Sequence, residues 1–398
     1  MSNLRERALK LHKESKGKLN ITSKVPVTNA DDLSLAYSPG VAEPCIEIQK
    51  DPKLVFDYTI KGNLVGVISN GTAVLGLGNI GPHAAMPVME GKAVLFKEFA
   101  DVDAFPICLD TVDVDKIVET VKLLEPTFGG INLEDIAAPQ CFEIEDRLKK
   151  ECQIPIFHDD QHGTAVVTAA GLINALKLVD KSIDQVRVVI NGAGAAGIAT
   201  TKLLLHLGVK DIVMCDTKGI IYEGRQLGMN PIKEEIALVT NKERVSGNLA
   251  DAMKNTDVFI GVSSAGAVSP EMVNSMNKDA IIFAMANPVP EIMPEEAKKA
   301  GAKVIGTGRS DFANQVNNVL AFPGIFRGAL DARAKEINET MMIAAVYAIA
   351  EIILPEELHP DYVIPSPFDL RVASNVAAAV SKAAIETGVA QISLTLEA

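Results

Sequence analysis

The sequence predicts an α/β fold in two parts: a Rossmann-type, doubly wound parallel sheet, preceded by a mixed α/β domain. Beyond residue 160, short apolar runs alternate with helical segments, which is typical of strands buried on both faces of a parallel sheet. Before it, short β-prone runs with turn signals occupy residues 58–77. The length of 398 residues also exceeds what one hydrophobic core usually supports. We therefore expect domains at 1–158 and 159–385, and a tail at 386–398 that can pack back on the first domain.

The first domain is expected to begin with a charged surface helix over residues 1–19. This segment is basic, but Glu6 and Glu14 are unlike a transit peptide, which avoids acidic residues. The β-prone runs are "YTIKG", "NLVGVISNG" and "TAVLGLG", and two later strands, "DAFPICLD" and "GGINLED", flank a helix over 114–124.

The second domain is expected to contain five apolar strands with helices between them. These strands cover residues 186–190, 211–215, 257–262, 280–286 and 303–308. The chain after residue 327 is helical and rich in alanine. Its apolar stretch 341–354 is interrupted by Glu351 and is shorter than the ~20 residues that span a bilayer, so we expect a buried helix and no membrane partner.

The charge and the cysteines limit the class of protein. The formal net charge is −13, so the surface would repel nucleic acid, and we expect no such partner. The five cysteines form no CxxC pair and are odd in number, which favours a reduced, cytoplasmic protein over a disulfide framework or a zinc site.

A glycine loop at residues 192–197 predicts a nicotinamide dinucleotide site. The loop Gly192-Ala193-Gly194-Ala195-Ala196-Gly197 follows an apolar strand and opens an amphipathic helix. The first glycine permits the tight turn, the second lets the backbone approach the pyrophosphate, and the third lets helix and strand pack closely. Asp216 ends the next strand, where an acid binds a ribose hydroxyl.

A second GxGxxG match lies at residues 76–81. It is followed by Pro82 and Pro87, and an interior proline makes the next segment a poor crossover helix. We therefore interpret this copy as a structural or substrate-side turn.

Two acidic doublets predict a divalent metal site. Glu134-Asp135 and Asp159-Asp160 each follow an apparent strand, and open α/β proteins bind ligands at the carboxyl ends of their strands. Three hard oxygen ligands suit Mg²⁺ or Mn²⁺. Either doublet alone would be read as a solvated turn or a helix cap. The neighbouring histidines at 158 and 162 lack the cysteines of a typical zinc site.

Lys92 and Tyr37 are further candidates. Lys92 stands in the largely apolar "MEGKAVLFKEF", and burial lowers the pKa of a lysine so that it can act as a base. From composition alone, Lys92 would be a lysine snorkelling from a helix and Tyr37 a core residue.

The combined motifs resemble the malic enzymes, specifically the short bacterial form. The similar segments are, in order, "YSPGVAEPC", "GLGNIGP…GK", "LEDI", "FHDDQHGTA", "GAGAAG", "ANPVPEI" and "NNVLAFPG", and they cover nearly the whole chain. The resemblance implies oxidative decarboxylation of (S)-malate to pyruvate and CO₂, with reduction of NAD⁺ or NADP⁺ and with Mg²⁺ or Mn²⁺. It also implies a homodimer.

The resemblance implies a role for each candidate residue. Tyr37 matches the proton donor, Lys92 matches the proton acceptor and also touches substrate, and Asp159 assists proton removal. The matched binding residues are Glu134, Asp135 and Asp160 for the metal, Asn287 and Asn318 for malate, and Gly194 to Gly197 together with Asn287 for the cofactor. Whether Tyr37 and Lys92 serve their own chain or a partner's site is left open.

One departure concerns the arginine that clamps a malate carboxylate in the long eukaryotic forms. Thr72 stands near the expected place, in "NGTAVLGLG", and Arg309 is another candidate for the clamp. Cofactor choice is also open, because Asp216 favours NAD while Lys218 could pair with a 2′-phosphate.

Two other functions fit part of the pattern. One is a dehydrogenase of another 2-hydroxy or amino acid with the same architecture. The other is a non-catalytic, nucleotide-binding regulatory protein, against which Tyr37, Lys92 and three metal-type carboxylates argue.

Overall fold

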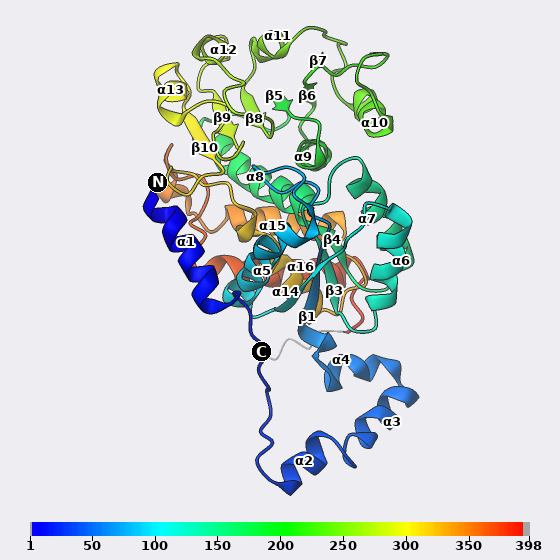
Figure 1. Ribbon diagram of the computed structural model, residues 1–398. Helices are drawn as coiled ribbons and strands as arrows, with labels where there is room; N and C mark the ends of the chain where they lie inside the picture. Colours follow the sequence, from blue (N-terminus) through cyan, green and yellow to red (C-terminus); the bar gives the residue numbers. More distant parts are fainter. Residues whose placement is uncertain (1, 393–398) are drawn as a thin grey trace.

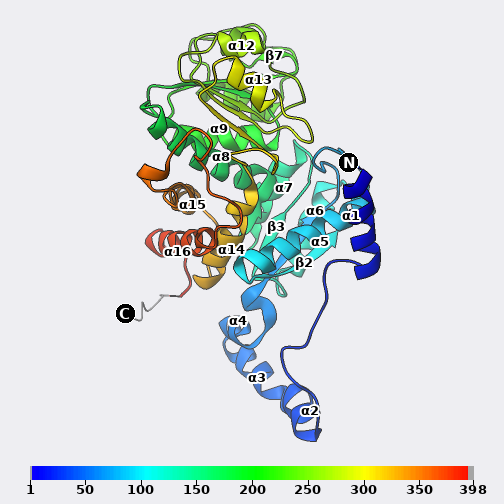
Figure 2. The same ribbon diagram turned by 90° about the vertical axis from the view of Figure 1, so that its left-hand side faces the viewer.

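Two sheet-based units make up the computed structural model, which describes residues 2–392 (Figures 1 and 2). The first sheet has the order β2-β1-β3-β4, and all its pairs are parallel. Its strands are β1 (Leu64–Ser69), β2 (Asp103–Cys108), β3 (Gly130–Leu133) and β4 (Ile156–His158). The chain moves from β1 to one side for β2 and to the other side for β3, so the strand order reverses between β1 and β3.

The second sheet confirms the predicted doubly wound architecture. Its order is β10-β9-β8-β5-β6-β7, and every pair is parallel except the short antiparallel pair β6-β7. Its strands are β5 (Arg187–Asn191), β6 (Asp211–Asp216), β7 (Gly219–Ile220), β8 (Val258–Gly261), β9 (Ile281–Ala284) and β10 (Val304–Thr307). Every residue of β8 and β9 is buried, which explains why they read as continuous apolar runs. Here the order reverses between β5 and β8.

Two of the three β-prone runs around β1 are not strands. Ile60–Asn63 form a short 3-10 helix, and residues 72–78 form a turn in which an isolated bridge joins Val74 to Gly78. Gly76 and Gly78 have φ angles of 74° and 73°, which an extended strand does not accept. The strand expectation was wrong there because the residues are β-prone while the backbone must turn toward the next helix.

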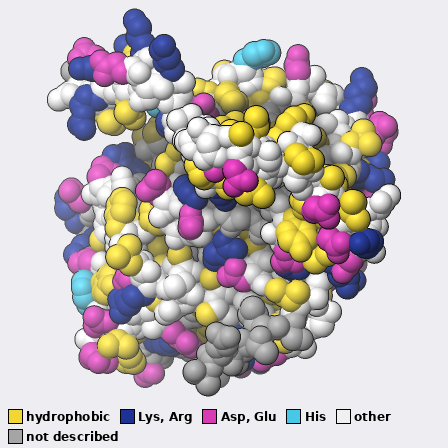
Figure 3. All heavy atoms as spheres, turned by 90° about the horizontal axis from the view of Figure 1, so that it is seen from below, with side chains coloured by type: hydrophobic (Ala, Val, Ile, Leu, Met, Phe, Trp, Pro, Cys, Tyr) yellow, Lys and Arg dark blue, Asp and Glu magenta, His cyan; other side chains and the backbone are white. Residues whose placement is uncertain are grey.

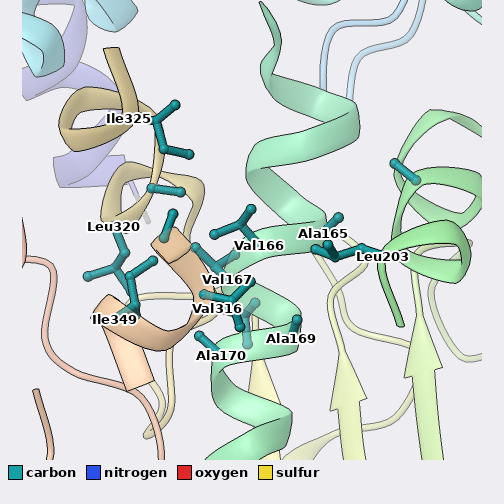
Figure 4. Close-up of a cluster of buried hydrophobic side chains, with 14 of the residues drawn as sticks. Ala165, Val166, Val167, Ala169, Ala170, Leu203, Val316, Leu320, Ile325 and Ile349 are labelled. Atoms are coloured by element: carbon teal, nitrogen blue, oxygen red, sulfur yellow. The ribbon is translucent and has the colours of Figure 1, made fainter. Parts of the chain in front are cut away.

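Helix α8 (Asp159–Leu178) is the central element of the core. It follows β4 without a loop, and residues 165–176 are all buried. In Figure 4 its Ala165, Val166 and Val167 lie among apolar side chains from other segments, including Leu203 of α9 (Ala195–His206) and Ile349. A helix covered on all sides is apolar all round and has little amphipathic period.

The C-terminal helices α14 (Phe322–Asp331), α15 (Glu339–Ala350) and α16 (Arg371–Glu386) pack together beside α8 (Figures 1 and 2). Helix α15 confirms a helix over the first part of the stretch 341–354, but it ends at Ala350 and is buried on one side only. Helix α14 also contacts α5 (Gly81–Ala100), with the Phe96 ring 4.7 Å from that of Phe322. Of the predicted tail, residues 393–398 lie outside the described residues.

Seven of the other helices in the described residues lie mainly on the outer faces of the two sheets: α1 (Ser2–Ser15), α6 (Val114–Leu124), α7 (Gln140–Glu151), α10 (Pro231–Val239), α11 (Leu249–Met253), α12 (Pro270–Asn274) and α13 (Pro294–Lys299). Three more, α2 (Ala30–Ala36), α3 (Ala42–Lys50) and α4 (Val55–Tyr58), lie apart from them. Helix α1 confirms the expected surface helix. No helix within residues 2–392 is both long and apolar enough to cross a membrane.

Helices α2, α3 and α4 form an arm that stands away from the two sheets (Figures 1 and 2). None of the described side chains of these three helices is buried. The exposed apolar side chains of the arm include Leu33, Leu35, Val41, Ile46 and Tyr58. Figure 3, which views the molecule from the arm's side, shows hydrophobic side chains on the surface among the charged ones.

Candidate active site

A cavity of about 740 Å³ lies between the carboxyl ends of the two sheets. From the first sheet it is lined by the turn after β1, including Thr72, and by Asp160. From the second it is lined by Gly194 and by Ser263, which follow β5 and β8. The two strand-order reversals therefore face one cavity, and such reversals are where open α/β sheets bind ligands.

The glycine loop has the geometry that a dinucleotide requires. Gly192 has a φ of 121°, and a Cβ on Gly197 would collide with the backbone oxygen of Gly192. A Cβ on Gly194 would meet no atom within 4 Å, so the backbone at this position is open to the cavity. Ala195 and Ala196 begin α9 and line the same cavity, so free N–H groups at the helix start can receive a phosphate. Gly76 and Gly78 also line it, from the first unit, as expected of a substrate-side turn.

Asp216 is held by two cations. Its carboxylate accepts hydrogen bonds from Arg225 Nη1 at 2.8 Å and Nη2 at 2.5 Å, and from Lys233 Nζ at 2.6 Å. These hydrogen bonds lower the pKa of Asp216 against the opposing effect of burial. The negative charge of Asp216, which was expected to favour NAD, is therefore neutralised, and sequence reasoning missed both cations.

Both acidic doublets follow strands of the first sheet, as predicted. Glu134 and Asp135 follow β3, and Asp159 and Asp160 form the first turn of α8 after β4. Asp135 adopts a φ of 54°, and its backbone N–H donates to Asp160 Oδ2 at 2.7 Å. One carboxylate oxygen each from Glu134, Asp135 and Asp160 lies within 4.8 Å of the other two.

This carboxylate cluster fits a divalent cation. Burial raises the pKa of Glu134, Asp135 and Asp160, and the neighbouring carboxylates raise them further. Asp135 Oδ2 is buried and has no hydrogen-bond partner among the described residues. Three hard oxygen donors beside a cavity leave the other octahedral positions of Mg²⁺ or Mn²⁺ to substrate and water.

Lys92 on α5 joins this carboxylate cluster to Asp159. Its Nζ lies 2.6 Å from Asp159 Oδ2 and 2.9 Å from Glu134 Oε1, and 4.2 Å from the centroid of the Phe322 ring. The expectation that burial alone would lower the pKa of Lys92 was wrong. Burial does act in that direction, but the charges of Asp159 and Glu134 raise the pKa of Lys92 above its usual value. Burial in turn raises the pKa of Asp159 to about 7.

Two asparagines complete the cavity wall. Asn318 Nδ2 donates to Asp159 Oδ2, and Asn287 precedes a cis peptide bond to Pro288. Both residues line the cavity. The structure thus brings together Lys92, Glu134, Asp135, Asp159, Asp160, Asn287, Asn318 and the glycine loop.

Tyr37 is not part of this assembly within one chain. It follows α2 on the arm, and it is 70% exposed. The structure therefore separates the expected proton donor from the other candidate catalytic residues of the same chain.

The two candidates for the carboxylate clamp differ in their surroundings. Thr72 lines the cavity, and its hydroxyl accepts from the backbone N–H of Ala137 at 2.9 Å. Arg309 donates two hydrogen bonds to Asp311, at 2.8 and 2.6 Å. These two guanidinium donors are therefore not free to bind a malate carboxylate.

Sequence reasoning missed the side chain that orients Glu134. Asn132 Nδ2 donates to Glu134 Oε2 at 2.8 Å, and Asn132 is fully buried. The signal was available, because residues two apart along a strand point to the same face, and Asn132 stands two residues before Glu134.

Comparison with known proteins shows similarity over nearly the whole chain. A family model described as "Malic enzyme, N-terminal domain" matches residues 16–113 and 111–149, and one described as "Malic enzyme, NAD binding domain" matches residues 161–385. The chain is 71% identical to the "Bifunctional malic/malolactic enzyme" of Bacillus subtilis, covering 99% of this chain and 96% of that protein. It is 57% identical to the "NAD-dependent malic enzyme" of Geobacillus stearothermophilus, covering 94% of this chain and 78% of that protein.

Solved structures agree with the sequence comparison. The malic enzyme from Pyrococcus horikoshii superimposes with a TM-score of 0.94 at 49% identity, covering 98% of this chain and 93% of that one. The NAD-dependent malic enzyme from Thermotoga maritima gives a TM-score of 0.91 at 52% identity, covering 94% of this chain and 98% of that one. With its two domains matched in order and its cavity built from both sheets, the chain belongs to the malic enzyme family.

Proposed function

We propose that this protein catalyses the oxidative decarboxylation of (S)-malate to pyruvate and CO₂, with reduction of NAD⁺ or NADP⁺ and dependence on Mg²⁺ or Mn²⁺. The observation that carries the proposal is the buried unit in which Lys92 bridges Asp159 and Glu134. Asp159 belongs to the proposed proton-transfer site and Glu134 to the proposed dication site, so Lys92 connects the two. Both lie beside the cavity that the glycine loop also lines.

The residues of the chain divide the chemistry between them. In this proposal Lys92 Nζ gives one proton to Asp159 Oδ2 as it accepts the proton of the malate C2 hydroxyl, and Asn318 orients Asp159. Asn287 lines the cavity where substrate and nicotinamide meet. When bound, the nicotinamide accepts the hydride and the dication supplies the Lewis acidity that eases loss of CO₂. The carboxylates that would hold the dication are Glu134, Asp135 and Asp160.

We further propose that the active form is a homodimer in which Tyr37 protonates C3 of the product enol in the partner's site. In its own chain Tyr37 is exposed on an arm that buries none of its described helical residues. The arm exposes apolar side chains to solvent, and in a homodimer a second copy of the chain would cover them. In this proposal Tyr37 acts in the active site of the partner chain, while Lys92 acts in the active site of its own chain.

For the cofactor we propose that both dinucleotides are accepted. Asp216 could bind a ribose 2′-hydroxyl, but Arg225 and Lys233 neutralise its charge and add a net positive charge. The glycine loop supplies Gly192, Gly194, Ala195, Ala196 and Gly197 to the pyrophosphate side.

The test is an absorbance assay at the reduced-nicotinamide band with malate and Mn²⁺, using NAD⁺ and NADP⁺ in turn, together with CO₂ capture. Equal amounts of reduced cofactor and CO₂ support the proposal. Reduction without CO₂ points to a simple dehydrogenase of a 2-hydroxy acid, and reduction with an amino acid alone points to the corresponding dehydrogenase. No reduction with any of these acids favours the regulatory, nucleotide-binding alternative.

A second activity is favoured by the relative that is 71% identical and whose name includes malolactic enzyme. In that reaction the cofactor reduced by malate would stay bound and reduce the pyruvate formed beside it, so malate would yield lactate and CO₂ with no net change of the cofactor. Lactate formation at catalytic amounts of NAD⁺ tests this activity, and its absence limits the chain to the oxidative reaction.

We also propose that residues 1–158 supply the substrate and metal side of the site and that residues 159–385 supply the cofactor side.

We propose further that the protein is cytoplasmic. All five cysteines are free, which suits a reducing compartment. Retention of activity in a reducing cytosolic fraction, with none in a membrane fraction, is the expected result.

A further inference from the structure

Glu291 is a fully buried carboxylate that no part of the proposed chemistry uses. It lies in the loop after β9, four residues beyond Asn287, and is 0% exposed. We infer that Glu291 is a positioning residue: it ties the ends of β5, β8 and β9 together and so shapes the cofactor side of the cavity.

The two oxygens of Glu291 hold two different strand ends. Oε1 accepts the backbone N–H of Ser263 at 2.8 Å and the Ser263 hydroxyl at 3.1 Å, just after β8. Oε2 accepts the backbone N–H of Ala286 at 3.0 Å, just after β9. The carboxylate thus bridges two neighbouring parallel strands at the point where their ladder stops.

A third strand end is connected through Ser263. Asn191, the last residue of β5, donates from Nδ2 to Ser263 Oγ at 2.8 Å, and Gly192 of the glycine loop follows it directly. One carboxylate therefore links the segment that begins the glycine loop to the segment that carries Asn287.

The site for this carboxylate is built into the backbone. A Cβ on Gly261, at the end of β8, would lie 2.6 Å from Glu291 Oε1 and 2.8 Å from Oε2. The hydrogen-bond partners found for the carboxylate among residues 2–392 are neutral donors, so it acts as an acceptor only and not as a member of an ion pair.

Glu291 acts through other residues and touches no substrate. Ser263, Ala286 and Asn287 line the cavity, whereas Glu291 lies behind them. A cavity wall made of loops keeps its shape only if something fixes the loops, and small displacements at such walls weaken binding strongly.

Replacement by glutamine gives a nearly isosteric test. An ionised carboxylate accepts at both oxygens, but an amide presents one oxygen and one NH₂. In Glu291→Gln the NH₂ must face either the Ser263 N–H or the Ala286 N–H. One of the two hydrogen bonds is then replaced by a contact between two donors.

The measurement is the Kd for NADH, followed by nicotinamide fluorescence without turnover, together with the KM for malate and the melting temperature. We expect Glu291→Gln to weaken NADH binding and raise the malate KM by about tenfold each, which corresponds to about 1.4 kcal/mol. NADH affinity and malate KM at wild-type values would overturn the inference, whatever the melting temperature does.

Asp257 supplies a matched control at the opposite end of β8. It is a buried carboxylate that accepts from the backbone N–H of Arg187 at 2.9 Å and from Lys181 Nζ at 2.8 Å. Asp257→Asn should lower the melting temperature but leave the Kd for NADH unchanged. An equal loss of NADH affinity in both variants would show a general loss of stability and would refute a positioning role.

A second variant reaches the same carboxylate from the other side. Gly261→Ala would displace the Glu291 side chain, so it should weaken NADH binding as Glu291→Gln does, and the double variant should be no weaker than the worse single variant. Additive losses would mean that the two changes act independently and would contradict the inference. The inference rests on the proposed cofactor site, and wild-type protein that binds no NADH would refute that proposal instead.

Discussion

Lys92 is the cation on which the buried part of the candidate active site depends. Its side chain is 7% exposed and lies between Asp159 and Glu134 at 2.6 and 2.9 Å. In Lys92→Met the variant keeps an unbranched apolar chain against the Phe322 ring but loses the ammonium group, with its charge and its N–H donors. The two carboxylates then remain buried with no cation between them.

The expected loss of turnover follows from the proposed role in proton transfer. A positioned acid or base contributes about 10²–10⁴-fold, so kcat should fall by that factor. The expected loss of stability has an upper bound, because removing one partner of a buried ion pair costs about 3–5 kcal/mol while both carboxylates stay ionised. Asp159 and Glu134 can limit the cost by protonation, since burial already raises the pKa of each to about 7.

The loss of stability should therefore depend on pH. For a buried acid whose pKa is raised, the unfolded chain releases its proton at lower pH than the folded chain, so stability falls as pH rises between the two values. In the variant, the pKa values of Asp159 and Glu134 rise further. The difference in melting temperature between wild type and Lys92→Met should thus grow from pH 5 to pH 8. Lys92 itself, with its pKa raised, contributes its full stabilisation throughout this range, because that contribution is lost only above its unfolded value.

The assay combines initial rates with malate and Mn²⁺ and thermal unfolding at several pH values in EDTA. Lys97→Met is the control, because Lys97 lies on the same helix, pairs with Asp101 and Asp103 and is itself 48% exposed. Its rates should match wild type. A kcat for Lys92→Met within tenfold of wild type, or a melting difference that does not change with pH, would refute the reasoning.

Three further outcomes are expected. Mn²⁺ at 100 times its Kd should stabilise the wild type by about 2.7 kcal/mol, which is seen as a rise in melting temperature. Asp160→Asn should abolish both this rise and the metal-dependent rate. A rise that persists in the variant contradicts the ligand assignment. Tyr37→Phe should lower kcat by about 10²–10⁴-fold. If each site uses Tyr37 of one chain and Lys92 of the other, mixing the Tyr37→Phe and Lys92→Met variants should restore about one quarter of wild-type activity. No restoration would mean that both residues act within one chain. Lys233→Gln should raise the KM for NADP⁺ by about tenfold and change that for NAD⁺ little, and a parallel change in both KM values would exclude a role for Lys233 at the 2′-phosphate.

Much of the fold could be predicted because its signals are local. The strands of the second sheet are buried on both faces and therefore read as apolar runs, and the glycine loop is a short backbone pattern that follows one of them. Residues 72–78 were misjudged because their side chains are β-prone while Gly76 and Gly78 take positive φ angles. Side-chain type predicts a strand only where the backbone is free to extend.

The candidate site could be predicted in part for a related reason. Both acidic doublets stand where strands of one parallel sheet end, and parallel strands present those ends at the same edge. The two doublets could therefore be placed together from the strand pattern alone, whereas the choice of residues 134, 135 and 160 as the metal ligands came from the resemblance to a known family. The roles of Lys92 and Asn318 needed the resemblance to a known family, since the apolar setting of Lys92 made it only a candidate and nothing local marks Asn318.

By itself, then, the sequence determined the architecture, the glycine loop and the set of metal-type carboxylates. Only the tertiary structure decided the electrostatics: that Lys92 is paired with Asp159 across 67 residues of sequence, and that Arg225 and Lys233 neutralise Asp216. It also decided that Tyr37 lies outside its own chain's site. The physical reason is that a pKa or an ion pair depends on charges within a few ångströms, and folding sets those distances whatever the separation along the chain.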